Sequence, residues 1–241
     1  MVHQTGVRRS VLGFWSCIAF AASCVTVLPE GVRGDAFTGY QLVGGFSLPP
    51  GAAVFDALSD GRIITLTGAD IYVETEPGSK SFDSVGTLPS ADFPSFGPAF
   101  LVVSPDGTRF AVGNNGGASF ANYRVGVFTV ASLSGDWFAA AHFDGAWIDN
   151  THIALTAGDF VNPSVVTVLD NTNTDPNNPT NPTIINGIGG ASAGVALDPA
   201  GNLYTGNGFA SGGPSGTGAV RAFRNAEWTA ALSGGPVLNF E

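Results

Sequence analysis

The sequence predicts an all-β fold, a β-propeller-like array of about four four-stranded antiparallel sheets. Three observations predict it: a hairpin phrase that recurs along the chain, two further β-rich runs after each hairpin, and a composition poor in helix formers. Glycine supplies 34 of the 241 residues, and charged residues make up only 12%. Abundant Gly together with Val, Thr and Phe favours short strands joined by tight turns.

The recurring phrase consists of two short apolar runs joined by a polar turn. It is clearest in VVSPDGTRFAVGNN (102–115) and VALDPAGNLYTGNG (195–208). Gly and Asn accept a positive φ at little cost, so a turn built on them closes a β-hairpin. Such turn residues recur about every 45 residues, at Gly61, Gly107, Asn150 and Gly201.

Two more apolar runs follow every hairpin. The third runs are IYVET, YRVGVFTV, SVVTVLD and GAVRAF, and the fourth runs are FDSVGTL, WFAAAHF, PTIING and PVLNF. Four strands in about 45 residues are typical of a propeller blade, which buries its faces only by stacking against its neighbours. The predicted blades span about 49–90, 91–143, 144–189 and 190–241, in a closed or an incomplete ring.

One strand has no place in these four blades. GYQLVGGFSL, residues 39–48, has the pattern of an outermost strand, yet each blade already has four. We interpret it as part of a blade that the chain does not contain, so that the chain is a piece of a longer propeller. A compact four-bladed ring with an added strand, and an open stack completed by self-association, are the alternatives.

Two segments interrupt the β pattern. Residues 224–232 (RNAEWTAAL) predict a short helix capped by Asn225. Residues 170–183 are rich in Asn and Pro and predict a polar loop. Asn171, Asn173 and Asp175 offer oxygens for a Ca²⁺ ion there. The full pattern of a Ca²⁺-binding loop is absent, however, so we expect a solvated loop stiffened by proline.

The N-terminus has the layout of an export signal. A basic start with an arginine pair at 8–9 precedes an uncharged stretch from Val11 to Leu28. Gly34 and Ala36 then place small residues at positions −3 and −1 of a possible cleavage site. We expect cleavage after Ala36, which makes residues 1–36 a signal peptide and residues 37–241 the propeller-like domain. The arginine pair leaves both the twin-arginine route and the general secretion route open.

Both cysteines, Cys17 and Cys24, lie inside this signal, so the processed chain has no disulfide. Lipid attachment at Cys24 and retention of an uncleaved segment are alternatives to cleavage. Contact with a membrane is expected only through that uncleaved segment. The expected location is secreted, periplasmic or on the cell surface of a bacterium.

Through SPDGTRFAVGNNGGASF and DPAGNLYTGNGF the chain resembles bacterial extracytoplasmic propellers with NHL and YVTN repeats. It is also similar to exported propeller proteins that end in a PEP-CTERM sorting tail. The resemblance covers about residues 37–241 and implies the fold and an exported location, whereas the generic hairpin motif implies no activity. No Val-Pro-Glu-Pro tail follows Glu241, so sorting by that route has no support in the sequence.

Polar residues recur in the loops where second strands end and in one loop that enters a first strand. In a propeller these loops meet at one end of the blades, here called the polar end. Carboxylate and amide groups gathered there suit Ca²⁺ or a small polar ligand, and no other cofactor is expected. Tight loops need the same residue types, which is the structural alternative. The candidates are Asp70, Asn114, Asn115, Asp144, Asp159 and Asn207.

Candidate catalytic groups are sparse. His142 and His152 have no nearby Gly-x-Ser-x-Gly motif, and we expect them, like Trp137, Trp147 and Trp228, to be packing or surface residues. A net charge of −10 opposes binding to nucleic acid. The sequence predicts a non-catalytic exported module that binds a protein, a glycan or a small polar ligand, or has a structural role. The alternative is a Ca²⁺-dependent propeller hydrolase or lactonase.

Overall fold

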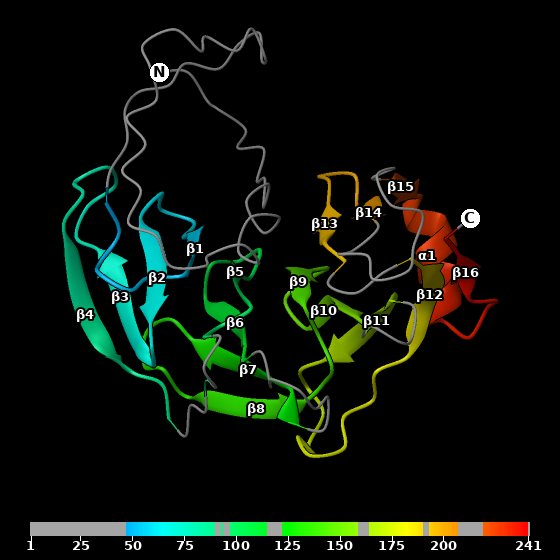
Figure 1. Ribbon diagram of the computed structural model, residues 1–241, viewed down its shortest axis with the longest axis horizontal. Helices are drawn as coiled ribbons and strands as arrows, with labels where there is room; N and C mark the ends of the chain where they lie inside the picture. The colour runs from blue at the N-terminus through cyan, green and yellow to red at the C-terminus, as the bar shows by residue number, and fades with distance from the viewer. Residues whose placement is uncertain are drawn as a thin grey trace, which may run out of the picture.

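The structure, a computed structural model, describes residues 47–89, 93, 97–114, 122–158, 164–189, 193–206 and 219–240. In them lie four small sheets, arranged in chain order around a common axis as the blades of a β-propeller (Figure 1). The all-β propeller fold expected from the repeats is confirmed. The predicted signal peptide with its cleavage site at Ala36, and most of the strand at 39–48, lie outside the described residues. No helix of the described residues is long and apolar enough to cross a membrane.

The first two blades each contain four antiparallel strands in chain order. The first blade consists of β1 (Val54–Ala57), β2 (Ile63–Thr67), β3 (Asp70–Glu74) and β4 (Phe82–Thr87). The second consists of β5 (Phe100–Val103), β6 (Arg109–Gly113), β7 (Arg124–Thr129) and β8 (Gly135–Ala139). The strands predicted for these blades are therefore confirmed.

The third and fourth blades share the C-terminal segment. The third contains β9 (Asp144–Trp147), β10 (His152–Ala157), β11 (Ser164–Asp170) and β12 (Thr183–Ile188), with β16 (Leu238–Asn239) as a fifth strand. The fourth contains β13 (Val195–Leu197), β14 (Leu203–Gly206) and β15 (Val220–Phe223). The helix α1 (Asn225–Leu232) connects β15 to β16.

The assignment of PVLNF to the fourth blade is wrong. Leu238 and Asn239 pair in parallel with Ile185 and Asn186 at the outer edge of the third blade. The reason is the helix α1, which buries Trp228 among apolar side chains of the third and fourth blades and carries the chain back to β12. An apolar run encodes a strand, but it does not encode which neighbouring sheet supplies the partner.

The predicted helix is present, but its cap lies one residue earlier than the sequence predicts. The N-cap is Arg224, whose backbone N–H donates to the Glu227 carboxylate at 2.9 Å. Asn225 is the first helical residue, and its side chain donates to the Ala200 carbonyl at 3.3 Å. Asn225 therefore ties the helix to the turn between β13 and β14.

The four marker residues occupy the same corner of successive blades, in the turn between first and second strands. Gly61, Gly107 and Gly201 have φ values of +90°, +72° and +77°. The N–H of each donates back across its turn, to the carbonyls of Leu58, Ser104 and Asp198. In the third blade the Asp149 carboxylate accepts the N–H groups of Thr151 and His152 instead. The repeat read from the sequence is thus a repeat in space.

Successive blades pack against each other through three apolar clusters, one at each junction. The innermost strands β1, β5, β9 and β13 lie nearest the axis in Figure 1, and each contacts the next. Tryptophans lie in these clusters or pack on them, and their indole N–H groups bond to backbone carbonyls: Trp137 to Pro89, Trp147 to Val102 and Trp228 to Gly201. The expectation that they are packing residues is confirmed.

Candidate functional site

Three of the six polar-end candidates are described, and they lie at the same end of the blades. Asp70 begins β3, Asn114 follows β6, and Asp144 begins β9. The other three, Asn115, Asp159 and Asn207, lie outside the described residues. The polar groups of the described three make hydrogen bonds within the protein, as follows.

Asp70 and Asn114 each join neighbouring strands of one blade. The Asp70 carboxylate accepts the Thr87 hydroxyl at 2.6 Å across the β3–β4 pair. Asn114 is only 4% exposed. Its Oδ1 accepts the Arg124 N–H at 2.8 Å, and its Nδ2 donates to the Asn122 carbonyl at 3.0 Å. Asn114 thus closes the connection between β6 and β7.

Asp144 joins two blades. Its Oδ2 accepts the backbone N–H of Val195, in β13 of the next blade, at 3.0 Å, and its Oδ1 accepts the Gly145 N–H at 2.9 Å. Burial raises the pKa of Asp144 to about 6, although these N–H donors act in the opposite direction. Asp56 makes the same kind of contact between the first and second blades, where it accepts the Val103 N–H at 2.7 Å.

Near Asp144 lies a buried histidine. His142 is fully buried, and its Nδ1 bonds to the Ala140 carbonyl at 2.8 Å, so Nδ1 carries the proton of the neutral ring. Burial lowers the pKa of His142 to about 4. Among the described residues, its Nε2 has no hydrogen-bond partner. The ring packs edge-on to Phe100 and Tyr123, which confirms a packing role.

The Asn/Pro loop contacts the second blade. Ala139 at the end of β8 donates to the Pro176 carbonyl at 2.7 Å and accepts from the Asn181 side chain at 3.4 Å. The Asn173 oxygen accepts the Asp175 N–H at 2.9 Å, within the loop itself. The segment is thus a loop, as predicted, but it covers an edge strand instead of standing free in solvent. Across the described ranges, no three His, Cys, Asp or Glu side chains cluster closely enough to hold a metal ion.

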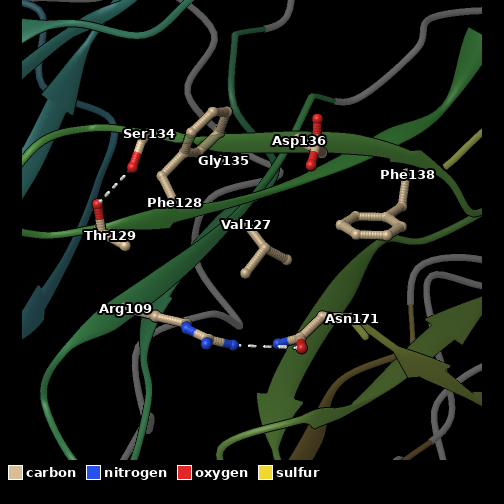
Figure 2. A pocket seen from close by; sticks show the side chains of 9 residues that line it. All are labelled: Arg109, Val127, Phe128, Thr129, Ser134, Gly135, Asp136, Phe138 and Asn171. Carbon is tan, nitrogen blue, oxygen red and sulfur yellow. Dashed lines mark hydrogen bonds between the residues drawn. The ribbon is translucent and has the colours of Figure 1, made fainter. Parts of the chain in front are cut away.

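A pocket of about 230 Å³, here called the Arg109 pocket, lies between the second and third blades (Figure 2). Its lining comes mainly from β6, β7 and β8, and Asn171 closes it from the third blade. Arg109 begins β6, Thr129 ends β7 and Asn171 follows β11. These are the strand ends opposite to the polar end. The lining residues are Arg109, Val127, Phe128, Thr129, Ser134, Gly135, Asp136, Phe138 and Asn171.

Hydrogen bonding groups of several kinds face this pocket. The Arg109 guanidinium reaches across the junction and donates to the Asn171 side-chain oxygen at 3.4 Å. The Thr129 and Ser134 hydroxyls lie 3.2 Å apart, and both bond to Ser132. Gly135 is required at its position because a Cβ there would collide with the Val127 carbonyl.

Sequence reasoning missed this pocket. Arg109 and Asn171 belong to different repeats, and the pocket exists only because two blades pack side by side. The one available signal was Arg109 itself, a cation in a chain with few of them: Lys and Arg together number 9.

No protein-family model matches the chain, and no curated protein matches it. Among solved structures, it is similar to a TolB-like protein from Agrobacterium tumefaciens, with a TM-score of 0.51 and 13% identity over 72% of this chain and 58% of that one. It is also similar to XC5397, a gluconolactonase from Xanthomonas campestris, with a TM-score of 0.51 and 13% identity over 72% and 59%. The chain thus spans less than two thirds of either protein. At this identity the likeness shows the β-propeller fold alone.

Proposed function

We propose that this protein is an exported, non-catalytic binding module that holds a small polar ligand in the Arg109 pocket. The observation that carries the proposal is the pocket itself. It brings a guanidinium, a carboxylate, a carboxamide and two hydroxyls from two blades around one concavity (Figure 2). Small-molecule sites typically combine a concave apolar wall with a few convergent polar groups.

Part of the pocket wall belongs to the packed core. Val127 and Phe138 line it and belong to the buried cluster that joins the second and third blades. Polar groups placed on packed strands lose little conformational freedom when a ligand binds. Export is supported by the layout of residues 1–36, with its arginine pair and uncharged stretch.

The catalytic alternative, a Ca²⁺-dependent hydrolase or lactonase, has weaker support. A gluconolactonase shares the fold, but Asp70, Asn114 and Asp144 bond to groups of the protein through their side chains. A calorimetric titration with Ca²⁺ and a lactone hydrolysis assay test this alternative. Ca²⁺ uptake that is lost in Asp70→Asn, together with lactone turnover, would favour it over the binding module.

The binding proposal is tested with a panel of small polar metabolites and ligand-detected NMR on the full chain. At least one member should bind, and its signal should disappear in the double variant Arg109→Gln/Asp136→Asn. The matched control is Arg62→Gln, because Arg62 pairs with Asp60 in the first blade, away from the pocket. A panel without any binder, or binding that the double variant leaves unchanged, would overturn the proposal.

A further inference from the structure

We infer that the ligand of the Arg109 pocket is a small monocarboxylate that also carries a hydrogen-bond donor, either an ammonium or hydroxyl groups. This inference rests on the proposed binding function and specifies its ligand class. Two oppositely charged side chains that line the same pocket without pairing carry it.

Arg109 supplies the positive charge. A guanidinium has five N–H donors, and in the described part of the chain the one hydrogen bond of this group is the 3.4 Å contact with Asn171. The described ion pairs, Arg62 with Asp60 and His152 with Asp149, do not include it. The Ser104 hydroxyl and the Thr108 N–H lower the pKa of Asp106 most, and Arg109 adds to this, but Arg109 and Asp106 make no ion pair. A guanidinium with unused donors facing a pocket suits a carboxylate bound through two parallel hydrogen bonds.

Asp136 supplies the negative charge. Its position on β8 pairs with Val127 on β7, so their side chains share the face that looks toward the third blade. Figure 2 shows Asp136 and Arg109 on opposite sides of Val127. A carboxylate only accepts hydrogen bonds. The ligand group that reaches Asp136 must therefore be a donor.

The two charges together exclude other ligand classes. A ligand with several negative charges would be repelled by Asp136 and by a chain of net charge −10. A purely cationic ligand would leave Arg109 without an anionic partner and would be repelled by its charge. A ligand with one carboxylate and a hydrogen-bond donor a few atoms away can bind Arg109 through the carboxylate and Asp136 through the donor.

The size of the pocket limits the ligand as well. Drug-sized ligands occupy pockets of roughly 300–1,000 Å³, whereas this pocket holds about 230 Å³. The ligand is therefore of metabolite size, such as an amino acid or a hydroxy acid.

The experiment uses four probes on the full chain, with affinities measured by calorimetry. 4-Aminobutanoate joins a carboxylate to an ammonium, and D-gluconate joins a carboxylate to hydroxyls. Butanoate lacks the donor, and D-glucose lacks the carboxylate. At least one of the first two should bind about tenfold or more tightly than both of the last two, because a hydrogen bond to a charged group is worth that much. Which of the two binds identifies the donor as ammonium or hydroxyl.

Variants of Arg109 and Asp136 test whether each of these side chains contacts the ligand. Arg109→Gln and Asp136→Asn should each weaken the affinity for the bound probe by about tenfold. Arg62→Gln should leave that affinity unchanged. If D-glucose binds as well as D-gluconate and Arg109→Gln has no effect, the ligand class is overturned while the binding function stands. If none of the four probes binds, the ligand class is overturned too, and the metabolite panel decides the binding function separately.

Discussion

The indole N–H of Trp147 donates a 3.0 Å hydrogen bond to the Val102 carbonyl. Trp147 lies on β9 and Val102 on β5, the innermost strands of neighbouring blades, and both side chains are buried. Stacked repeats derive much of their stability from interfaces between neighbours, because a single repeat cannot bury both of its faces. This bond therefore adds a directional polar contact to the apolar cluster at this junction.

Replacing Trp147 with Phe should lower the free energy of unfolding by about 1–3 kcal/mol, because it leaves the buried Val102 carbonyl without the indole donor. Urea denaturation followed by circular dichroism measures the loss. The matched control is Trp137→Phe. The Trp137 indole donates to Pro89 at 2.9 Å on a more exposed side of the molecule, and water can replace it. Equal losses in the two variants would show that burial of the contact does not matter.

Gly107→Ala should be more destabilising than Gly78→Ala, although both glycines have similar positive φ values, +72° and +77°. A left-handed backbone conformation costs an L-residue about 1–2 kcal/mol, and both variants should lose this amount of stability. A Cβ at Gly107 also meets the Ser59 side chain of the first blade, whereas a Cβ at Gly78 meets nothing within 4 Å. The extra cost should be about 1 kcal/mol or more.

Thermal or urea unfolding of both variants measures this difference. A Gly107→Ala variant no less stable than Gly78→Ala would mean that Ser59 moves aside freely. The repeated turns would then lie at matching corners without supporting one another.

The repeat and the hairpin turns could be predicted because both are local. A Gly or Asn between two alternating apolar runs specifies a turn in any context, and the recurrence of that turn specifies blades. The place of β16 could not be predicted in this way. Leu238 pairs with Ile185, a partner set by how α1 packs and not by the strand's own residues.

The site was harder to predict, for a related reason. Asn114 has the residue type and position of a ligand group, but its amide is bonded to the β6–β7 connection at both ends. An Asn that closes a loop and an Asn that binds a ligand look alike in sequence. The Arg109 pocket depends on contact between repeats, which no single repeat encodes.

His142 should make the protein sensitive to acid. The pKa of His142 is about 4 in the fold against an ordinary value of 6.5, because burial disfavours the charged ring. Its contribution to stability is therefore complete above pH 6.5 and is lost as the pH falls toward 4, by at most about 3 kcal/mol. His142→Phe keeps an aromatic ring and cannot be protonated.

The difference in unfolding free energy between His142→Phe and the wild type should therefore shift in favour of the variant from pH 7 to pH 4.5. Urea titrations at the two pH values measure it. Other groups that titrate in this range cancel, because they are present in both proteins. A difference that does not change with pH would mean that the His142 ring is as easily charged in the fold as in the unfolded chain.

Asp144 should have the opposite pH dependence. The pKa of Asp144 is raised from 3.8 to about 6 by burial, so its contribution is complete below pH 3.8 and is lost as the pH rises through 6. Asp144→Asn retains an oxygen to accept the Val195 N–H without the cost of ionisation, and gives up only the second acceptor, which faces the Gly145 N–H. This variant should be more stable than the wild type at pH 7, by at most about 3 kcal/mol, and the advantage should shrink toward pH 4.

Asp144→Ala provides the contrast, because it removes the acceptor and leaves the Val195 N–H without its partner in the neighbouring blade. The free energy of unfolding of Asp144→Ala should rise less at pH 7 than that of Asp144→Asn. At pH 4, Asp144→Ala should be less stable than the wild type. Unfolding free energies of the three proteins at both pH values separate the hydrogen bond from the charge. If Asp144→Asn is as destabilised as Asp144→Ala at pH 7, the ionised carboxylate itself stabilises the junction between the third and fourth blades.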